Sequence, residues 1–398
     1  NCRGLDSAEQ VERLRLAIEQ CCRGWAATYH KGVLAVSGGL DSSILATCLA
    51  GVVDLECLTL HTDEPRGDET IYARELCSDL SLKLHSIPYQ LEHADILRSA
   101  VAHLPRPGGR TQMTAYDAAV IRQMIRRSAD VFFTGAGGDN VFYNTHSARP
   151  VVDRFMSDGL NVGLLTTIRD VAQITEASIW EVARSAVRIP RKHGPKYHCR
   201  FDPQFLHQNW VEQLSMERPS HPWLEAPHDA LPGKCGHVAM IARAQHYLHG
   251  YDRRLPFSAI APLLSQPVVE AALVIPSWQA CEDGVDRSVA RRAFVDKLPP
   301  QIARRKMKGG PDAFAIEILR ANHDRVRERL LGGHLATNGI IDGNEVEGVF
   351  AAGQVCEDTN YVRLLFLLDT EAWIDGWRSS RPRASAPHIA GPIRAIQA

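Results

Sequence analysis

The sequence is poor in the features that mark several large classes of protein. It contains no apolar run of membrane-spanning length, no signal peptide, no internal repeat and no C-x-x-C pair. No G-x-x-x-x-G-K-S/T stretch occurs either, which excludes a Walker A nucleotide site. A formal net charge of −1 gives the 398-residue chain no overall attraction to nucleic acid. We therefore expect a soluble protein that inserts into no membrane and binds no nucleic acid.

What the chain does contain is typical of a globular enzyme. Hydrophobic residues make up 45% of it and charged residues 23%, which provides for a large core. Its ten cysteines are scattered, and several stand in apolar stretches that we expect to be buried. That distribution indicates reduced thiols in the cytoplasm and argues against a zinc site.

The most informative stretch is an apolar run that breaks into small residues and then continues at helical spacing. Residues 33–36 have the pattern of a buried strand, and residues 44–49 that of a helix. In the loop between them, Gly38 and Gly39 let backbone N–H groups approach an anion, and the following helix directs its positive dipole end there. The loop predicts a phosphate site. We expect its nucleotide contacts to be Ser37, Gly38, Gly39, Asp41, Ser42 and Ser43.

One residue of this loop carries the wrong charge for a phosphate site. Asp41 would repel a phosphate unless a cation lay between them, so the loop predicts Mg²⁺ bridging Asp41 to pyrophosphate oxygens. The stretch Ser37-Gly-Gly-Leu-Asp-Ser42 resembles the PP-loop signature of the ATP pyrophosphatases, which cleave ATP between its α and β phosphates. A Gly-Ser turn after an ordinary strand is the alternative interpretation.

Strand and helix patterns alternate through the first 150 residues. Further strands are indicated at 55–60, 82–87 and 131–134, and helices at 69–80 and 114–127. This alternation predicts an α/β fold with a parallel, doubly wound sheet. Ligands of such sheets bind at the carboxyl ends of the strands, which is where the phosphate loop lies.

A second glycine loop, Thr134-Gly-Ala-Gly-Gly-Asp-Asn140, follows the last of these strands. It brings Asp139 to the same edge of the sheet, so we expect Asp41 and Asp139 to share one Mg²⁺ and its pyrophosphate. A Rossmann loop would need glycine where Asn140 stands, which excludes that pattern. The expected nucleotide contacts in this loop are Gly135, Gly137 and Gly138.

The second loop resembles the Gly-x-Gly-Gly-Asp-Glu stretch of the asparagine synthetase family, with Asn140 in place of the Glu. The resemblance implies that Leu60 and His61, at the end of the second strand, lie near the adenine of ATP. Asp68 and Glu69 occupy the place of an acidic pair that opens the next helix in the family. Favourable charge at a helix N-terminus explains this pair equally well, so we assign it no catalytic role.

The half that starts near residue 151 is mainly helical in pattern, and we expect it to build the acceptor pocket. The segment His249–Phe257 resembles a family segment in which Glu and then Arg precede Pro-Phe. This resemblance implies that Asp252 and Arg254 act at the acyl-adenylate. A surface Asp–Arg pair is the competing interpretation.

Further along, a basic helix at 286–294, a Leu-Pro turn at 298–300 and the run Arg304–Gly310 resemble the family's C-terminal order. Two lysines in that run compete for the cation that the family provides for the transition state. Lys308 fits the pattern Arg-x-x-Lys-Gly and Lys306 fits Arg-x-Lys; we favour Lys308. Such a cation would stabilise the charge that develops on the α-phosphate.

Six basic residues between 184 and 200, with little acid nearby, form either a solvated loop or a docking surface for an acidic peptide or partner. The expected organisation is a helical segment at 1–23, a PP-loop core at 24–150, an acceptor-binding half at 151–378 and a disordered tail at 379–398.

The resemblance spans about residues 24–378 and implies an ATP-dependent carbon–nitrogen ligase. A substrate carboxylate would attack the α-phosphate of ATP to give an acyl-adenylate and pyrophosphate, and an amine would then displace AMP to form an amide. No glutaminase half with a catalytic N-terminal cysteine precedes the motifs, and Cys2 is not the first residue. We therefore expect a branch whose nucleophile is already an amine.

Among such branches the chain is most like the lasso peptide cyclases, which close a macrolactam. That interpretation implies a lasso precursor as the peptide substrate, with a leader-binding protein and a leader protease as partners. Asparagine synthetase and β-lactam synthetase activities on a small carboxylate stay open. A non-catalytic ATP-binding scaffold conflicts with the presence of Asp41 and Asp139, and a tRNA-modifying PP-loop enzyme would favour paired cysteines or a basic domain.

Overall fold

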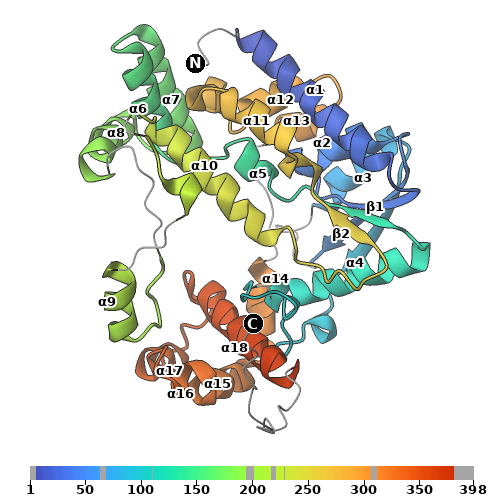
Figure 1. Ribbon diagram of the computed structural model, residues 1–398, viewed down its shortest axis with the longest axis vertical. Helices are drawn as coiled ribbons and strands as arrows, with labels where there is room; N and C mark the ends of the chain where they lie inside the picture. Colours follow the sequence, from blue (N-terminus) through green and yellow to red (C-terminus); the bar gives the residue numbers. More distant parts are fainter. Residues whose placement is uncertain are drawn as a thin grey trace, which may run out of the picture.

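The structure is a computed structural model with a central parallel sheet (Figure 1). It describes residues 6–62, 69–109, 111–193, 201–216, 221–227, 229–305 and 312–380. The strand order is β3-β2-β1-β4-β5, and all four neighbouring pairs are parallel. The strands are β1 (Lys31–Ala35), β2 (Asp54–His61), β3 (Lys83–Pro88), β4 (Val131–Phe133) and β5 (Ser258–Ile260). The predicted parallel α/β sheet is confirmed.

Helices cover both faces of the sheet because neighbouring strand residues point to opposite sides. Leu34 and Phe133 belong to the core under α1 and α2, whereas Val33 and Phe132 belong to the core under α4. The helices around the sheet are α1 (Ser7–Ala26), α2 (Leu40–Leu49), α3 (Thr70–Asp79), α4 (Thr114–Arg127), α11 (Gln266–Val274), α12 (Ser288–Ala293) and α13 (Pro300–Ala303).

The sequence predicted α3 to within one residue at each end and predicted both ends of α4. The helix expected within residues 1–23 is α1, which begins at Ser7 and ends three residues after residue 23. Its start is fixed by a capping box, in which the Glu9 N–H donates to the Asp6 carboxylate at 2.9 Å and the Asp6 N–H donates back to Glu9 at 3.0 Å.

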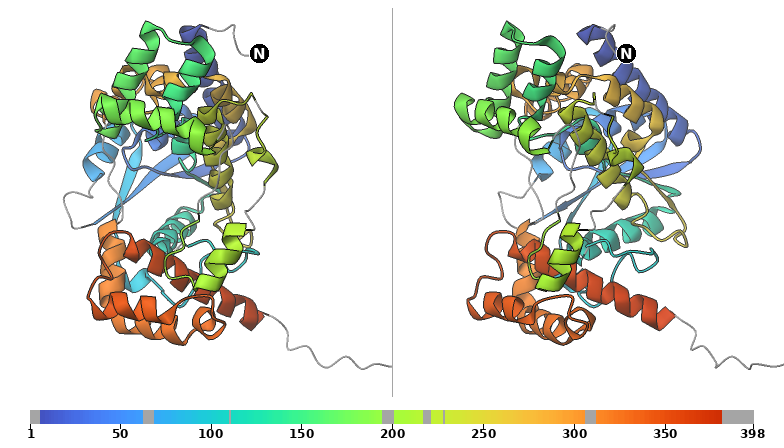
Figure 2. Two further views of the ribbon diagram at one scale, coloured as in Figure 1. Left: turned by 90° about the vertical axis from the view of Figure 1, so that its left-hand side faces the viewer. Right: turned by 60° about the vertical axis from the view of Figure 1, so that its left-hand side comes forward.

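The C-terminal half is mainly helical, as predicted, and its helices form two groups at opposite ends of the molecule (Figures 1 and 2). One group is α6 (Arg149–Asp158), α7 (Val162–Thr175) and α8 (Ile179–His193), next to α5 (Gly138–Val141) and α10 (Pro232–Ala244). The other is α9 (Gln208–Met216), α14 (Asp312–Ala321), α15 (His323–Gly332), α16 (His334–Thr337), α17 (Gly343–Ala351) and α18 (Asn360–Ser380).

Strand β5 is the part of this half that the sequence did not predict. It pairs with β4 and completes the sheet, so the core does not end at residue 150. Three residues are too few to show an alternating pattern, which is why the strand was not recognised.

No helix in the described ranges is both long enough and apolar enough to cross a bilayer. The cysteines in those ranges have free thiols, as their scattered spacing predicted: Cys21, Cys22, Cys48, Cys57, Cys77, Cys235, Cys281 and Cys356. The other two, Cys2 and Cys199, lie outside the described residues, as does the predicted tail from residue 381 onwards.

Candidate active site

The first glycine loop joins β1 to α2. Gly38 has a φ of +62°, and a Cβ there would lie 2.2 Å from the Tyr72 Cβ, so no other residue fits. The Gly39 carbonyl accepts hydrogen bonds from the Ser42 and Ser43 hydroxyls, at 3.2 and 2.8 Å. These bonds fold the loop over the N-terminus of α2, where the helix dipole favours an anion.

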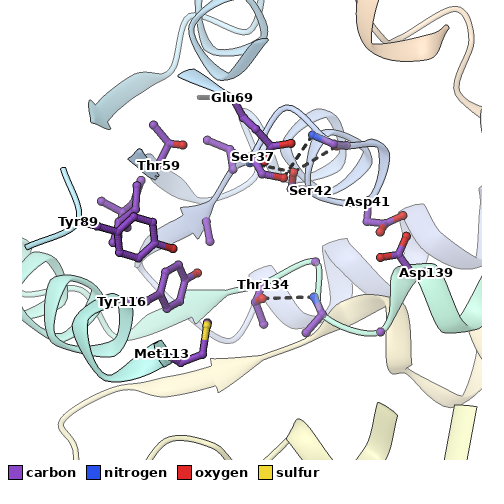
Figure 3. A pocket seen from close by; sticks show the side chains of 18 of the residues that line it. Ser37, Asp41, Ser42, Thr59, Glu69, Tyr89, Met113, Tyr116, Thr134 and Asp139 are labelled. Atoms are coloured by element: carbon purple, nitrogen blue, oxygen red, sulfur yellow. Dashed lines mark hydrogen bonds between the residues drawn. The ribbon is translucent and has the colours of Figure 1, made fainter. Parts of the chain in front are cut away.

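The second glycine loop, between β4 and α5, packs directly on the first. A Cβ on Gly135 would lie 3.0 Å from the Ser42 nitrogen, and one on Gly138 would lie 2.4 Å from the Asp41 Cγ. The close approach of the loops therefore depends on these glycines. It brings Asp41 and Asp139 face to face, as Figure 3 shows.

The two loops form one end of a cavity of about 350 Å³ (Figure 3). Predicted residues that line it are Ser37, Gly39, Asp41, Ser42, Leu60, Gly135, Gly137 and Asp139. Gly38, Ser43 and Gly138 shape the loops without lining the cavity. His61 is described but does not line the cavity, whereas Leu60 and Thr62 do, since successive residues of a strand point to opposite faces.

The other end of the cavity is formed by Met113, Tyr89 and Tyr116, which sequence reasoning missed (Figure 3). Tyr89 directly follows β3 at the carboxyl edge of the sheet, so the rule that located the loops could have located it too. Its ring stacks on Phe314, with 4.7 Å between centroids, and burial raises the pKa of Tyr89 to about 12. The hydroxyl therefore stays protonated and can donate a hydrogen bond to a ligand.

Arg287 lies between the two aspartates and is a further residue that sequence reasoning missed. Its Nη1 is 3.3 Å from Asp41 Oδ1 and 2.5 Å from Asp139 Oδ1, and its Nη2 is 2.8 Å from Asp286 Oδ2. Burial opposes the charged form of this residue, but the three carboxylates outweigh burial and raise the pKa of Arg287. The guanidinium therefore stays charged and neutralises the loop aspartates.

The residues also fit the Mg²⁺ that the sequence predicted between Asp41 and Asp139. Enzymes that act on nucleotides bind Mg²⁺ through one or two carboxylates, and phosphate oxygens and water complete its shell. Both aspartates line the cavity, and the Asp139 side chain is 37% exposed. No cluster of three His, Cys, Asp or Glu that could hold a metal occurs in the described ranges. The protein would thus supply two ligands, and a phosphate-bearing ligand would supply others.

Asp252 and Arg254 do not line the cavity of the phosphate loops. Arg254 Nη2 lies 2.5 Å from Asp252 Oδ2 at a separate cavity of about 610 Å³, and hydrogen bonds from Arg254 lower the pKa of Asp252 to about 2. The Arg254 side chain is exposed, which fits the alternative interpretation of a surface Asp–Arg pair. The role of both residues at the acyl-adenylate stays a prediction.

Lys306, Lys308 and Asp68 lie outside the described residues, so their roles stay predictions. Glu69, the neighbour of Asp68, stands at the N-terminus of α3 and lines the cavity.

In the basic segment at 184–200, Arg184 and Arg188 are exposed on α8. The other basic side chains of the segment lie outside the described part of the chain. Both interpretations of this segment, a solvated loop and a docking surface, therefore stay predictions.

Comparison with known protein families matches residues 30–375 to the asparagine synthase family, described as "Asparagine synthase". No curated protein matches the chain at a significant level. Enzymes of this family are ligases that use ATP to form amide bonds, which agrees with the phosphate loops at the sheet edge. Because the match extends from the start of β1 into α18, the protein belongs to the asparagine synthase family.

Proposed function

We propose that this protein activates a carboxylate with ATP, through an acyl-adenylate, and joins it to an amine of the same peptide to close a macrolactam. The observation that carries the proposal is the pair of aspartates on two touching glycine loops at one end of a single cavity. A pair of carboxylates at a helix N-terminus suits a metal–pyrophosphate group better than any other common ligand.

The cavity suggests how ATP would lie. Its phosphates would occupy the loop end, and the adenine would lie against the apolar wall of Val36, Leu58 and Leu60. Asp41 and Asp139 would hold Mg²⁺, which supplies positive charge to the phosphate oxygens. Arg287 would balance the charge of both aspartates, so that they do not repel the incoming nucleotide.

The proposed reaction has two steps. A carboxylate oxygen of the substrate attacks the α-phosphorus, and the bond to the bridging oxygen breaks, so that pyrophosphate leaves. The amine then attacks the acyl carbon, the bond from that carbon to the adenylate oxygen breaks, and AMP leaves with that oxygen while the amine loses a proton. The adenylate is needed because it converts a poor leaving oxygen into a good one.

Asn140 supports a branch other than the parent synthetase. Its side-chain amide donates a hydrogen bond to the Met240 carbonyl at 2.9 Å, which ties the second loop to α10. The Glu of the family pattern could not donate this bond, because an ionised carboxylate only accepts. Asn140 therefore has a structural task here in place of a charged one.

A free N-terminal amine is needed before the ring can close, so we place a leader-binding protein and a leader protease before this enzyme, in the cytoplasm. The acceptor can be tested with synthetic peptides that carry a free N-terminal amine and one Asp or Glu at successive positions. With ATP and Mg²⁺, the matching peptide should lose the mass of one water, and its N-acetylated form should not. Asparagine formed from aspartate and ammonium, with every peptide unchanged, would assign the parent activity instead.

A further inference from the structure

Arg305 is the last described residue before the segment that carries Lys306 and Lys308, and it is fixed to the first phosphate loop. Its Nη1 lies 3.4 Å from the carbonyl oxygen of Ser37 and 3.2 Å from that of Gly38. Its Nη2 lies 2.7 Å from Glu69 Oε1. One side chain thus joins the end of α13 to the phosphate loop and to the start of α3.

This contact is largely buried, which distinguishes it from a surface ion pair. The side chains of Arg305 and Glu69 are 14% and 12% exposed. The guanidinium also lies over the ring of Tyr72, 4.2 Å from its centroid, and the Cβ of the same tyrosine packs against Gly38. Glu69 and Tyr72 therefore hold Arg305 from one side while the loop carbonyls accept its N–H groups from the other.

A second arginine holds the backbone on which Arg305 stands. Arg291 Nη1 donates to the Ala303 carbonyl and Nη2 to the Arg305 carbonyl, both at 2.8 Å. Arg291 Nη2 also lies 2.5 Å from Asp286 Oδ1, and the other oxygen of Asp286 binds Arg287. Ion pairs and hydrogen bonds therefore connect the two loop aspartates, through Arg287, Asp286 and Arg291, to the backbone of Arg305.

We propose that Glu69 and Arg305 form a latch that fixes the start of the lysine segment on the phosphate loop, and that both are positioning residues for ATP cleavage. This inference rests on the proposed function. Lys308 follows Arg305 by three residues in the sequence. Arg305 itself is not the transition-state cation, because its donors are directed at Glu69 and the loop carbonyls.

The latch predicts a loss of rate with little loss of ATP affinity. Glu69→Gln keeps the size of the side chain but removes its charge, and Arg305→Lys keeps the charge but cannot bridge three oxygens. Each should lower kcat for AMP formation by roughly 10²-fold, the effect of misplacing a reacting group by about 1 Å. Affinity for α,β-methylene ATP should change less than about threefold. Free guanidinium should partly restore kcat in Arg305→Ala.

Two control variants distinguish the latch from a general effect of mutation. Arg304→Ala removes the exposed neighbouring arginine, and Glu347→Gln breaks the exposed ion pair between Arg327 on α15 and Glu347 on α17. Both should keep the wild-type kcat, and thermal unfolding should show that every variant is folded.

The possible outcomes separate the two proposals. If the wild type forms AMP and pyrophosphate but the latch variants keep their kcat, the latch is wrong and the proposed function stands. A parallel loss of kcat and analogue affinity, without rescue by guanidinium, would also overturn the positioning role. If the wild type forms no AMP, the proposed function itself fails.

Discussion

Two sets of Asp–Arg contacts in this protein share residue types and short contact distances but differ in burial. Asp41 and Asp139 meet Arg287 in a buried cleft between two loops, where only 6% of the arginine is exposed. Asp252 and Arg254 meet at the surface, where 87% of the arginine side chain is exposed. Exposed pairs contribute little to stability, whereas a buried pair that loses one member leaves an uncompensated charge. Burial at the carboxyl edge of the sheet, rather than residue type, therefore distinguishes the candidate site.

The largest expected effect comes from removing one charge in the buried set. Asp41→Asn should lower the rate of AMP and pyrophosphate formation by roughly 10³-fold, because it withdraws a proposed ligand of Mg²⁺ and keeps the side-chain shape. Asp252→Asn is the matched variant at the surface, and its rate should fall by less than about threefold. Product chromatography with both variants checks this. Equal losses would mean that the surface pair also serves the reaction.

The next largest loss of rate is expected at Lys308. Lys308→Ala should lower kcat by roughly 10²- to 10³-fold with little change in ATP affinity, because a positioned cation acts mainly on charge that develops in the transition state. Lys306→Ala should be milder. Steady-state kinetics and separate ATP binding decide between them, and a large loss confined to Lys306→Ala would reverse the assignment.

Arg287 and Arg254 should differ in how much they contribute to the free energy of unfolding. Arg287→Met leaves three carboxylates close together and should lower the free energy of unfolding by about 3 kcal/mol. Arg254→Met should leave it unchanged. Mg²⁺ should restore part of the lost stability in Arg287→Met, because it can neutralise Asp41 and Asp139, and should do less for the wild type. Denaturant unfolding with and without Mg²⁺ measures both; no difference between the arginines would contradict the comparison.

A smaller effect is expected from pH, at two buried groups that do not line the cavity, His237 and Asp153. Burial lowers the pKa of His237 to about 3, so the stability that it contributes above about pH 6.5 is lost as the pH falls towards 3. Burial raises the pKa of Asp153 to about 6, so its contribution is present below about pH 3.8 and is lost as the pH rises through 6. The two oppose each other between pH 6 and 4.

Replacing His237 should isolate its contribution to the pH dependence of stability. His237→Gln keeps a donor for the Val141 carbonyl and abolishes the titration. The stability difference between wild type and variant should therefore shrink by about 2 kcal/mol between pH 7 and 5. Unfolding at several pH values checks this, and a difference that is constant with pH would show that His237 is not buried as a neutral group.

The sequence was sufficient for four of the five strands of the sheet and for both loops because their signals are local. A strand pattern followed by Gly38 and Gly39 identifies the first loop wherever the rest of the chain lies, and parallel strands bring the second loop to the same edge. Arg287 could not be found in this way, since it reaches Asp41 and Asp139 through contacts distant in sequence. Tyr89 could have been found, because it directly follows a strand at the same edge of the sheet.

The central claim is that a substrate carboxylate attacks the α-phosphate of ATP at the two loops. Its most direct test uses the cyclising peptide labelled with ¹⁸O in the reacting side-chain carboxylate, followed by mass spectrometry of the nucleotide. The account predicts that one labelled oxygen passes into AMP, because the oxygen that attacks phosphorus leaves with the nucleotide when the amide forms. Label in inorganic phosphate, with ADP as the nucleotide product, would contradict it.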